Sequence, residues 1–404
     1  MSVLRPADIL IPKIKDFTKW SVVACDQFTS ESEYWTTLKE LVGKEYSTLN
    51  LVYPEIYLED NTKERIKLIN DNMVKYLEDG VFDEYKNCFI LTVRDTKYVK
   101  NRVGLIGVVD LEEYSFEFEK KPFIRPTEAT VKERIPPRIE IRKNAVLEFP
   151  HVMLLVDDEE ENVIEDLFKK KEELKKIYDS DLNMDGGHIA GYLIEDTAPV
   201  LEKFESLLNK DRLVKKYGKE ERLLFAVGDG NHSLATAKVM WESIKPTLTK
   251  EEQETSKARF ALVEICNVYQ EAIYFEPIFR FVTGIDKDAF LKGLESINFG
   301  KVTLYDGEET VYNNDLSVPE TIINVDEYIK DFILNNGGKV DYIHGVENVK
   351  NLVDKFGGVG IIFDKFDKNS LFKYIIDKGI LPKKTFSMGE GIEKRYYLEG
   401  RRIK

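Results

Sequence analysis

Apolar residues recur along the chain with two periods, one typical of strands and one typical of helices. Short apolar runs bounded by turn-forming residues predict strands at 20–25, 88–93, 103–110, 152–156, 222–227, 261–267 and 359–363. Helical spacing of the apolar positions predicts helices at 61–77, 159–178, 234–244 and 371–378. Ser30 and Glu33 have the spacing of a capping box and predict a further helix start. The sequence therefore predicts a fold of mixed α/β class.

The pattern of elements changes after about residue 284, which predicts a division of the chain into two units. A chain of 404 residues is longer than a single core usually organises. We expect a core with helical insertions at 1–284 and a C-terminal α/β unit at 285–404, packed on the core because no Pro/Gly/Ser-rich linker separates them. Irregular structure is expected at 130–147, which Pro136 and Pro137 interrupt, and in the glycine-containing segment 181–191.

The composition opposes several classes of protein. With 43% hydrophobic and 33% charged residues, the chain is globular rather than disordered. A net charge of −14 opposes binding to nucleic acid and to anionic membranes, although a local basic pocket can still hold a phosphorylated small molecule. No apolar run approaches the ~20 residues of a membrane span, and the N-terminus lacks a signal-peptide core, so a cytoplasmic location is expected. The sequence leaves the oligomeric state open.

Several common motifs are absent from the chain. There is no P-loop, dinucleotide-binding fingerprint, HExxH, GxSxG or protein-kinase signature. The three cysteines form no CxxC pair, which disfavours a zinc or disulfide framework. Residues 181–186 open like a calcium-binding loop, but Tyr192 stands where the bidentate Glu ligand is required.

The strongest candidate site is a glycine-containing turn between a buried strand and a helix. Its residues are Gly228, Asp229, Gly230, Asn231, His232 and Ser233. Glycines allow positive φ and close backbone approach, and a helix start offers N–H groups and partial positive charge to a phosphate or carboxylate. His232 can also move a proton near neutral pH. The alternative is a structural turn in which Asp or Asn caps the helix.

A basic segment provides the second candidate. Arg125, Arg134 and Arg138 suit phosphate or carboxylate, and Glu128 among them suits a general base or a metal ligand. The alternative is a salt-bridged surface segment. Lys238, on the predicted helix that follows the turn, is a further candidate cation.

Two weaker candidates lie elsewhere in the chain. The first is 185–188, for which a plain turn is the alternative. The second is 385–391, a possible anion loop beside Lys394 and Arg395. His151 stands alone and is interpreted as structural.

These motifs together resemble a known family. The chain is identified as a member of the domain-of-unknown-function family 1015 on segments spread over nearly its whole length, which are 5–6, 25–31, 125–130, 229–233, 276–280 and 381–389. The resemblance implies a core like that of the chromosome-partition protein ParB, sulfiredoxin and the free-serine kinases.

In those kinases an acidic residue acts as the base and an Asp-Gly-His-His-Arg segment holds nucleotide phosphate. By similarity, Glu128 matches the acidic residue and 229–233 matches the phosphate segment. Thr127 stands where a His is usual, Asn231 replaces the first His of the pair, and Ser233 replaces the Arg, so another cation must supply the lost charge.

The leading hypothesis is therefore small-molecule phosphoryl transfer, with free serine or phosphoserine as substrate, ATP or ADP as nucleotide partner, and Mg²⁺ bridging phosphate and carboxylates. The predicted catalytic residues are Glu128, Asp229 and His232. The predicted phosphate-binding residues are Gly228, Gly230, Asn231, Ser233, Arg125, Arg134, Arg138 and Lys238. The alternative is a nucleotide-binding switch or scaffold without turnover. In either case we expect Glu128 and the turn to line one cleft, with at least two of the predicted cations pointing into it.

Overall fold

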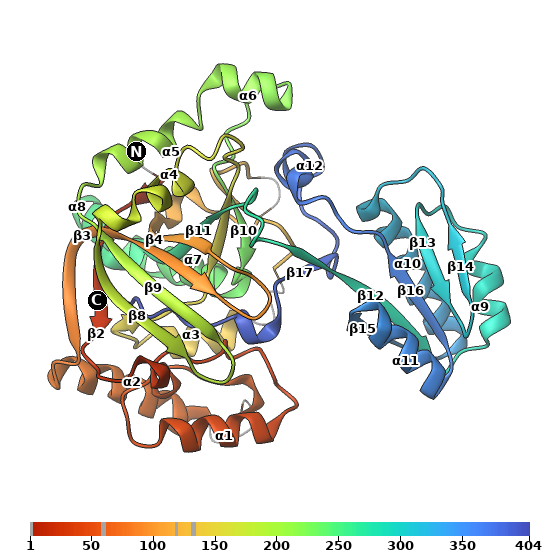
Figure 1. Cartoon of the computed structure of the whole chain (residues 1–404), viewed down its shortest axis with the longest axis horizontal. Helices are drawn as coiled ribbons and strands as arrows, with labels where there is room; N and C mark the ends of the chain where they lie inside the picture. The colour runs from red at the N-terminus through yellow and green to blue at the C-terminus, as the bar shows by residue number, and fades with distance from the viewer. Residues whose placement is uncertain (1–2, 58–61, 118–119, 131–134) are drawn as a thin grey trace. The chain divides into compact units, whose positions relative to one another are not determined.

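The computed structural model describes residues 3–57, 62–117, 120–130 and 135–404 and divides into two units (Figure 1). Unit 1 comprises Met1–Ile273 and Glu390–Lys404, and unit 2 comprises Tyr274–Gly389. The expected boundary at 284/285 differs from this division. Strand β12, Phe275–Thr283, lies inside the sheet of unit 2, so the boundary precedes it, and the sequence pattern changes near 285 because β12 ends there. The tail 390–404 belongs to unit 1 rather than to the C-terminal unit.

The sheet of unit 1 has the candidate turn near one edge. Its strand order is β5-β10-β7-β11-β4-β3-β9-β8, with β1 beside β4 and β2 beside β3. The β5–β10 and β7–β11 pairs are parallel, and the other neighbours are antiparallel. The strands are β1 Leu4–Arg5, β2 Ala7–Pro12, β3 Phe82–Asp95, β4 Arg102–Asp110, β5 Ile124–Pro126, β7 Met153–Val156, β8 Lys175–Leu182, β9 Gly187–Ile194, β10 Phe225–Asp229 and β11 Phe260–Asn267, while β6 Leu147–Glu148 pairs with β18 Arg401–Arg402.

Hydrophobic cores lie on both faces of this sheet. One core joins the sheet to α4, α5 and α7, through side chains such as Ile164, Phe204 and Trp241. The other joins it to α2 and the C-terminal tail, through side chains such as Met73 and Leu398. The helices of unit 1 are α1 Ser32–Val42, α2 Thr62–Glu78, α3 Ile135–Arg142, α4 Ile164–Lys169, α5 Ala198–Ser206, α6 Lys210–Tyr217, α7 Asn231–Ile244 and α8 Lys250–Thr255.

Unit 2 is an antiparallel sheet with helices on both faces. The strand order is β14-β13-β16-β12-β15, and β17 also pairs with β12. Val282 of β12 packs with α9 and α10, whereas Phe279, three residues away and on the opposite face, packs with α11. The elements are β12, α9 Lys287–Leu294, β13 Val302–Tyr305, β14 Glu309–Tyr312, α10 Val318–Asn336, β15 Lys339–His344, α11 Val346–Phe356, β16 Val359–Phe363, α12 Leu371–Lys378 and β17 Phe386–Met388. Both units combine helices with sheets, which confirms the mixed α/β class.

Several predicted elements differ from the structure. Residues 159–178 form the short helix α4 and the start of strand β8 rather than one helix, and residues 181–191 form the β8–β9 hairpin rather than an irregular loop. Strand β8 pairs only with β9 among the described strands, and an edge strand tolerates the charged residues that suggested a helix. In the segment 130–147, the described part of α3 runs from Ile135 to Arg142, with Pro136 and Pro137 near its start, where a helix tolerates proline.

The predicted strand at 20–25 and the capping box of Ser30 are also wrong. In that segment only Val23 makes a bridge, to Arg395, because its apolar side chains fill a small core with α1. Helix α1 begins after Glu31 and has no side-chain cap. The backbone of Val22 and Ala24 therefore bonds to the C-terminal tail instead of to a neighbouring strand.

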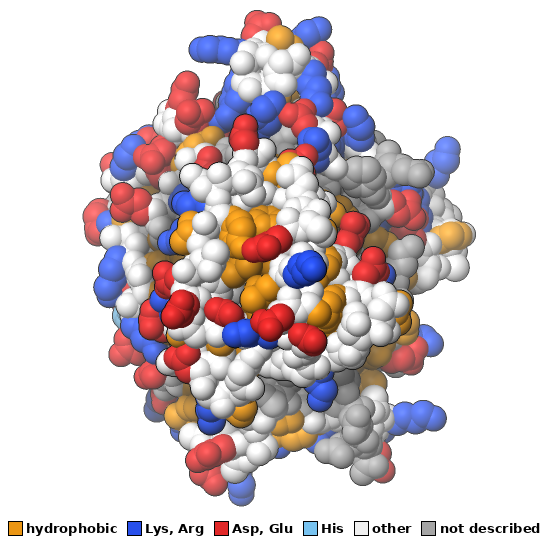
Figure 2. Space-filling model, turned by 90° about the vertical axis from the view of Figure 1, so that its right-hand side faces the viewer, with side chains coloured by type: hydrophobic (Ala, Val, Ile, Leu, Met, Phe, Trp, Pro, Cys, Tyr) orange, Lys and Arg blue, Asp and Glu red, His pale blue; other side chains and the backbone are white. Residues whose placement is uncertain are grey.

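Charged side chains of both signs are interspersed on the face seen in Figure 2, with hydrophobic side chains between them. Among the described residues, no helix combines the length and the apolar composition that crossing a bilayer requires.

The buried Arg280 of unit 2 generates a stability prediction. Its side chain is 0% exposed and makes two bonds to Asp326, at 2.7 and 2.8 Å. Asp326→Ala leaves a buried guanidinium without its carboxylate, and we expect a loss of about 3 kcal/mol in the free energy of unfolding. Asp331→Ala, at an exposed position of the same helix, is expected to change it by less than about 0.5 kcal/mol. Urea denaturation of the full chain measures both, and equal effects would contradict this role of the pair.

Candidate functional site

The two sequence motifs lie side by side in the structure. Strand β5 runs parallel to β10, with Pro126 opposite Val227, and the Thr127 hydroxyl donates a hydrogen bond of 2.8 Å to the Val227 carbonyl. The last paired residues are Pro126 and Val227, so Glu128 on one strand and Gly228 and Asp229 on the other follow at the same end of the two strands, although about 100 residues separate the two motifs along the chain. Carboxyl ends of parallel strands meet at the same edge of a sheet, which is why these polar side chains come together.

A bulge turns the end of β10 toward the site. Val227 pairs with Leu154 of β7 and Asp229 pairs with Met153, so Gly228 is an extra residue in the ladder. Such a bulge bends the strand and redirects the next side chain. The sequence pattern predicted the turn, and the structure adds that Gly228 sits at an irregularity in the strand itself.

Helix α7 begins at this turn without a side-chain cap. Gly230 is its N-cap residue in the left-handed conformation, with φ 79° and no capping side chain. The Asp229 carboxylate accepts instead from the N–H of Gly230, at 2.8 Å. The structural alternative, in which Asp229 or Asn231 caps the helix, is therefore wrong. Uncapped first-turn N–H groups and the helix dipole favour an anion at this end.

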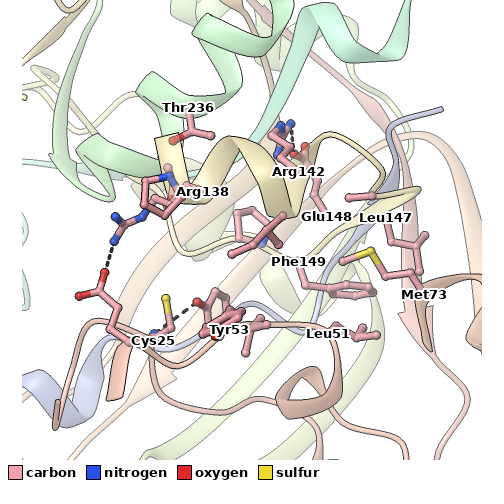
Figure 3. Close-up of a pocket in the computed structure, with 18 residues that line it drawn as sticks. Cys25, Leu51, Tyr53, Met73, Arg138, Arg142, Leu147, Glu148, Phe149 and Thr236 are labelled. Atoms are coloured by element: carbon pink, nitrogen blue, oxygen red, sulfur yellow. Dashed lines mark hydrogen bonds and ion pairs between the residues drawn. The ribbon is translucent and has the colours of Figure 1, made fainter. Parts of the chain in front are cut away.

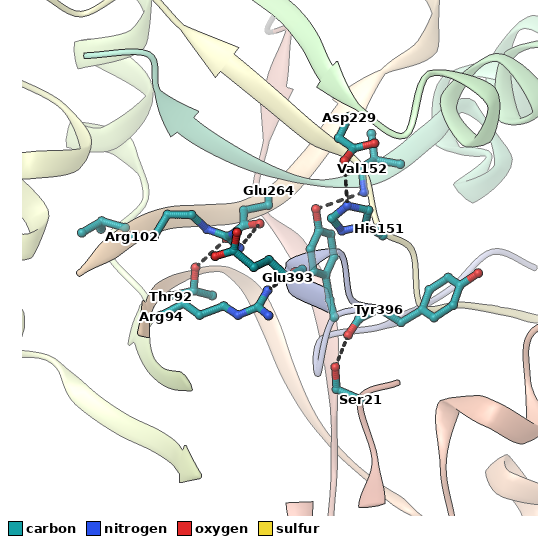
Figure 4. Close-up of polar contacts among 12 residues, drawn as sticks. Ser21, Thr92, Arg94, Arg102, His151, Val152, Asp229, Glu264, Glu393 and Tyr396 are labelled. Atoms are coloured by element: carbon teal, nitrogen blue, oxygen red, sulfur yellow. Dashed lines mark hydrogen bonds and ion pairs between the residues drawn. The ribbon is translucent and has the colours of Figure 1, made fainter. Parts of the chain in front are cut away.

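Asp229 is held by two basic side chains, of which Figure 4 shows His151. Its Oδ2 atom lies 3.0 Å from Nζ of Lys394 and 3.3 Å from Nε2 of His151. Burial opposes the charged form, but Lys394 and then His151 lower the pKa of Asp229 well below its ordinary value of 3.8. The charged form of Asp229 is therefore favoured by its two basic neighbours.

Lys394 lies among three carboxylates. Its side chain is 16% exposed. Burial lowers its pKa, but Asp229, Asp26 and Glu128 together raise it above the ordinary value. The ammonium therefore stays charged beside Asp229, the residue that precedes the N-cap of α7. Sequence reasoning associated Lys394 with a different loop, and it interpreted His151 as structural.

The tail that carries Lys394 is fixed by buried polar contacts, several of which Figure 4 shows. Nη1 of Arg94 donates to the carbonyl of Glu393 at 2.6 Å, and the hydroxyl of Tyr397 accepts from the N–H of Val152 at 3.0 Å. The Lys394 carbonyl accepts from the N–H of Ala24 at 2.7 Å. These bonds come from different strands and loops, so the ammonium has little freedom to move away from Asp229.

Two predicted phosphate-binding cations point elsewhere. Arg125 pairs with Glu221 at 2.8 Å and donates to Pro122, toward the start of β5. Lys238 lies about two turns along α7, where it donates to the carbonyl of Leu111 at 2.8 Å and pairs with a neighbouring carboxylate. These two therefore do not count toward the two cations expected at the turn, because Arg125 has its partner near the start of β5 and Lys238 has its partners midway along α7.

The other predicted residues that the structure describes lie near the turn. Arg138 of α3 pairs with Glu55 and lines a cavity that Ser233 also lines. His232 is half-buried on the first turn of α7. The Asn231 Oδ1 atom is buried without a hydrogen-bond partner among the described residues. Arg134 lies outside the residues that the structure describes.

The Asp229 carboxylate does not fit Mg²⁺ as the structure holds it. Both oxygens of Asp229 already face donors, which are the N–H of Gly230, Lys394 and His151. Over the described part of the chain, no group of three or more His, Cys, Asp or Glu side chains is arranged to hold a metal ion. The positive charge fixed in this site is the Lys394 ammonium.

Comparisons with known proteins identify a family. The model of a family described as "Protein of unknown function (DUF1015)" matches residues 4–354. The matched region ends before 381–389, a segment on which the sequence resemblance also rested. A search of curated proteins returns no match.

Solved structures resemble the chain at low identity. They include a free serine kinase in complex with AMP (10% identity, 74% of this chain and 90% of that chain, TM-score 0.39). A conserved hypothetical protein from Pyrococcus furiosus is another (10%, 74% and 94%, TM-score 0.36). A third is C-terminally truncated SbnI from Staphylococcus aureus (8%, 70% and 82%, TM-score 0.36). At these values the likenesses assign no role to any residue.

The Gly230 backbone generates a prediction with an internal control. A Cβ atom at Gly230 would lie 2.3 Å from the His151 carbonyl oxygen, whereas Gly218, with a similar φ of 76°, has nothing within 4 Å. Gly218→Ala should cost about 1 kcal/mol from the positive φ alone. Gly230→Ala adds a backbone clash, so we expect a loss of about 3 kcal/mol in urea denaturation. Equal losses in the two variants would show that the backbone at His151 moves aside at no measurable cost in stability.

The Asp229–Lys394 pair generates a prediction about pH. Removing one member leaves the other largely buried and unpaired, so Lys394→Met should lower the free energy of unfolding by about 3 kcal/mol near neutral pH. Lys373→Met breaks the exposed pair with Asp377 and should cost about 0.5 kcal/mol or less.

The pH dependence of this loss follows from the two pKa shifts. The lowered pKa of Asp229 gives stability that is present above 3.8 and is lost as the pH falls below it. The raised pKa of Lys394 gives stability that is present below 10.5 and is lost as the pH rises through the folded-state pKa. The difference between wild type and Lys394→Met should therefore be largest between these values and shrink in acid. A difference that grows in acid would contradict the ion pair.

Proposed function

We propose that this chain, which belongs to the family described as "Protein of unknown function (DUF1015)", transfers a phosphoryl group between a nucleotide, ATP or ADP, and a small hydroxyl compound. The observation that carries the proposal is that Glu128 follows β5 at the same end at which β10 leads into the uncapped start of α7, with the Lys394 ammonium paired with Asp229 and influenced by the charge of Glu128. A carboxylate, a cation and a helix N-terminus at one place are the parts that phosphoryl transfer uses to move a proton and hold charge.

The start of α7 binds the phosphate in this proposal. Its first-turn N–H groups and the Ser233 hydroxyl donate to phosphate oxygens, and Lys394 balances their charge. The unpartnered Oδ1 of Asn231 accepts from an O–H or N–H group of the small substrate. Lys394 takes the place of the arginine that the turn lacks, which the sequence had led us to expect from 125, 134 or 138.

Glu128 accepts the proton of the attacking hydroxyl. The hydroxyl oxygen bonds to the terminal phosphorus, the bond from that phosphorus to its bridging oxygen breaks, and the electron pair leaves with the nucleotide. The proton passes to the Glu128 carboxylate, and the reverse reaction uses the same groups. Asp229 orients Lys394 and stays ionised throughout.

Free serine and phosphoserine are the first substrates to test. The match of 229–233 to the phosphate segment of the free-serine kinases suggests them, and serine offers a primary hydroxyl together with an ammonium group for Asn231 or the neighbouring carboxylates. His232 lies on the same turn. In this proposal it takes part in catalysis beside Glu128 and Asp229 by returning a proton to the leaving oxygen of the nucleotide.

One observation favours a second function, nucleotide binding without turnover. Lys394 and His151 both contact the Asp229 oxygen that a metal ion bound with the phosphates would use. A binding protein of this kind would bind nucleotide tightly and change its association state, and wild-type protein would convert no nucleotide with any small hydroxyl compound.

The test of the proposed base is Glu128→Gln. Gln keeps the shape of the side chain but accepts no proton, so phosphoryl transfer between ATP and serine should fall by about 10²–10⁴ while nucleotide affinity changes little. Glu221→Gln is the matched control, because Glu221 pairs with Arg125 at the opposite end of β5 and β10 and its loss should leave turnover within about twofold. Coupled turnover assays and calorimetric binding measure the two quantities. Wild-type turnover that survives in Glu128→Gln would place the base elsewhere.

A further inference from the structure

A cavity of about 360 Å³ lies next to the start of α7 in unit 1 (Figure 3). Its walls are mainly apolar and come from α2, α3 and the segments around Leu51 and Phe149. Representative wall residues are Leu51, Tyr53, Met73, Ile141, Leu147 and Phe149. The volume and the apolar lining are those of a small-molecule pocket.

The cavity and the candidate site are built from the same three segments. Cys25 lines the cavity and precedes Asp26, Tyr396 lines it two residues after Lys394, and Ser233 belongs to the first turn of α7. The N–H of Cys25 donates to the Tyr396 hydroxyl at 3.3 Å, which joins two of these segments at the wall. A ligand that fills the cavity can therefore place an anionic end at the start of α7.

The chemistry of the walls selects the kind of ligand. The charged side chains on the lining form ion pairs, Arg138 with Glu55 and Arg142 with Glu148, so the cavity presents no unbalanced charge to its occupant. Free serine carries an ammonium and a carboxylate on a very small body, and apolar walls would desolvate both without compensation. A flat, neutral ring system with polar edges fits better, since its faces bury against apolar and aromatic side chains.

We propose that the cavity binds the nucleoside of the phosphate donor, with the phosphates directed to the start of α7. This inference rests on the proposed function, because it uses the same anion site. The aromatic and aliphatic walls hold the base, and the polar side chains Ser233, Thr236 and Arg138 lie at the end nearest α7. The hydroxyl substrate then occupies the space beside Glu128, outside the cavity.

Calorimetric titration of the full chain with ADP and with inorganic pyrophosphate tests this inference. Both carry the diphosphate, but only ADP carries a nucleoside, so wild type should bind ADP at least about tenfold more tightly, a factor that corresponds to ~1.4 kcal/mol. Ile141→Trp fills the cavity from a partly exposed position of α3 and should abolish this preference while the affinity for pyrophosphate is retained. Val214→Trp, on α6 and away from the cavity lining, should leave the preference intact.

The outcomes separate the two proposals. Equal affinity of wild type for ADP and pyrophosphate would overturn the assignment of the cavity and leave anion binding at α7 standing. An unchanged preference for ADP in a folded Ile141→Trp protein would overturn it as well. Failure to bind either compound would contradict the proposed function itself. Thermal unfolding reports whether Ile141→Trp is folded. If this variant is not folded, the affinities of wild type for ADP and for pyrophosphate still decide whether a nucleoside adds to binding.

Discussion

The ion pair between Asp229 and Lys394 joins the tail 390–404 to the turn that begins α7. Both charges are largely withdrawn from water, so each is tolerable only in the presence of the other. The tail must therefore be in place before the turn has a balanced charge. Unit 2 interrupts unit 1 in the sequence, yet the candidate site of unit 1 is assembled from residues on both sides of that interruption. The site is consequently a product of the whole of unit 1.

The position of Lys394 depends on buried guanidinium groups that bond mainly to carbonyl and amide oxygens. Arg395 donates to the Ser21 carbonyl at 2.6 Å and to the side chain of Asn183. Burial lowers the pKa of Arg395 to about 10, and Tyr34 acts in the opposite direction. Such groups tolerate little displacement, because each lost bond leaves a buried charge without a partner. The result is a fixed cation beside an open helix start, which needs little reorganisation when an anion binds.

The proposed anion site and the cavity are formed by the same segments of the chain. Ser233 of the first turn of α7 lines the cavity, and the Cys25 and Tyr396 segments supply both a wall and a charged neighbour. A single ligand with an apolar body and an anionic end would use all of these features together. Phosphate held at α7 and a base held against Phe149 and Tyr53 would then leave Glu128 facing the remaining open space.

The sequence by itself determined the class of fold, several central strands and helices of unit 1, and the turn at 228–233. Those features depend on local periodicity, on glycine and on the order of apolar residues, all of which can be read along the chain. It also paired Glu128 with that turn, through resemblance to a family. Arg125 and Lys238 looked equally suitable, since residue type and charge say nothing about which partner a long side chain will reach.

Only the tertiary structure decided the cation of the site and the limits of the units. Lys394 and His151 reach Asp229 from segments far away in sequence, and no local pattern records a long-range ion pair. Strand β12 joins the second unit because its hydrogen-bonding partners occur later in the chain, and β8 is a strand because β9 pairs with it despite its charged residues. The physical reason is the same in each case: pairing across the sheet and burial of charge are set by contacts between distant residues, which sequence order does not encode locally.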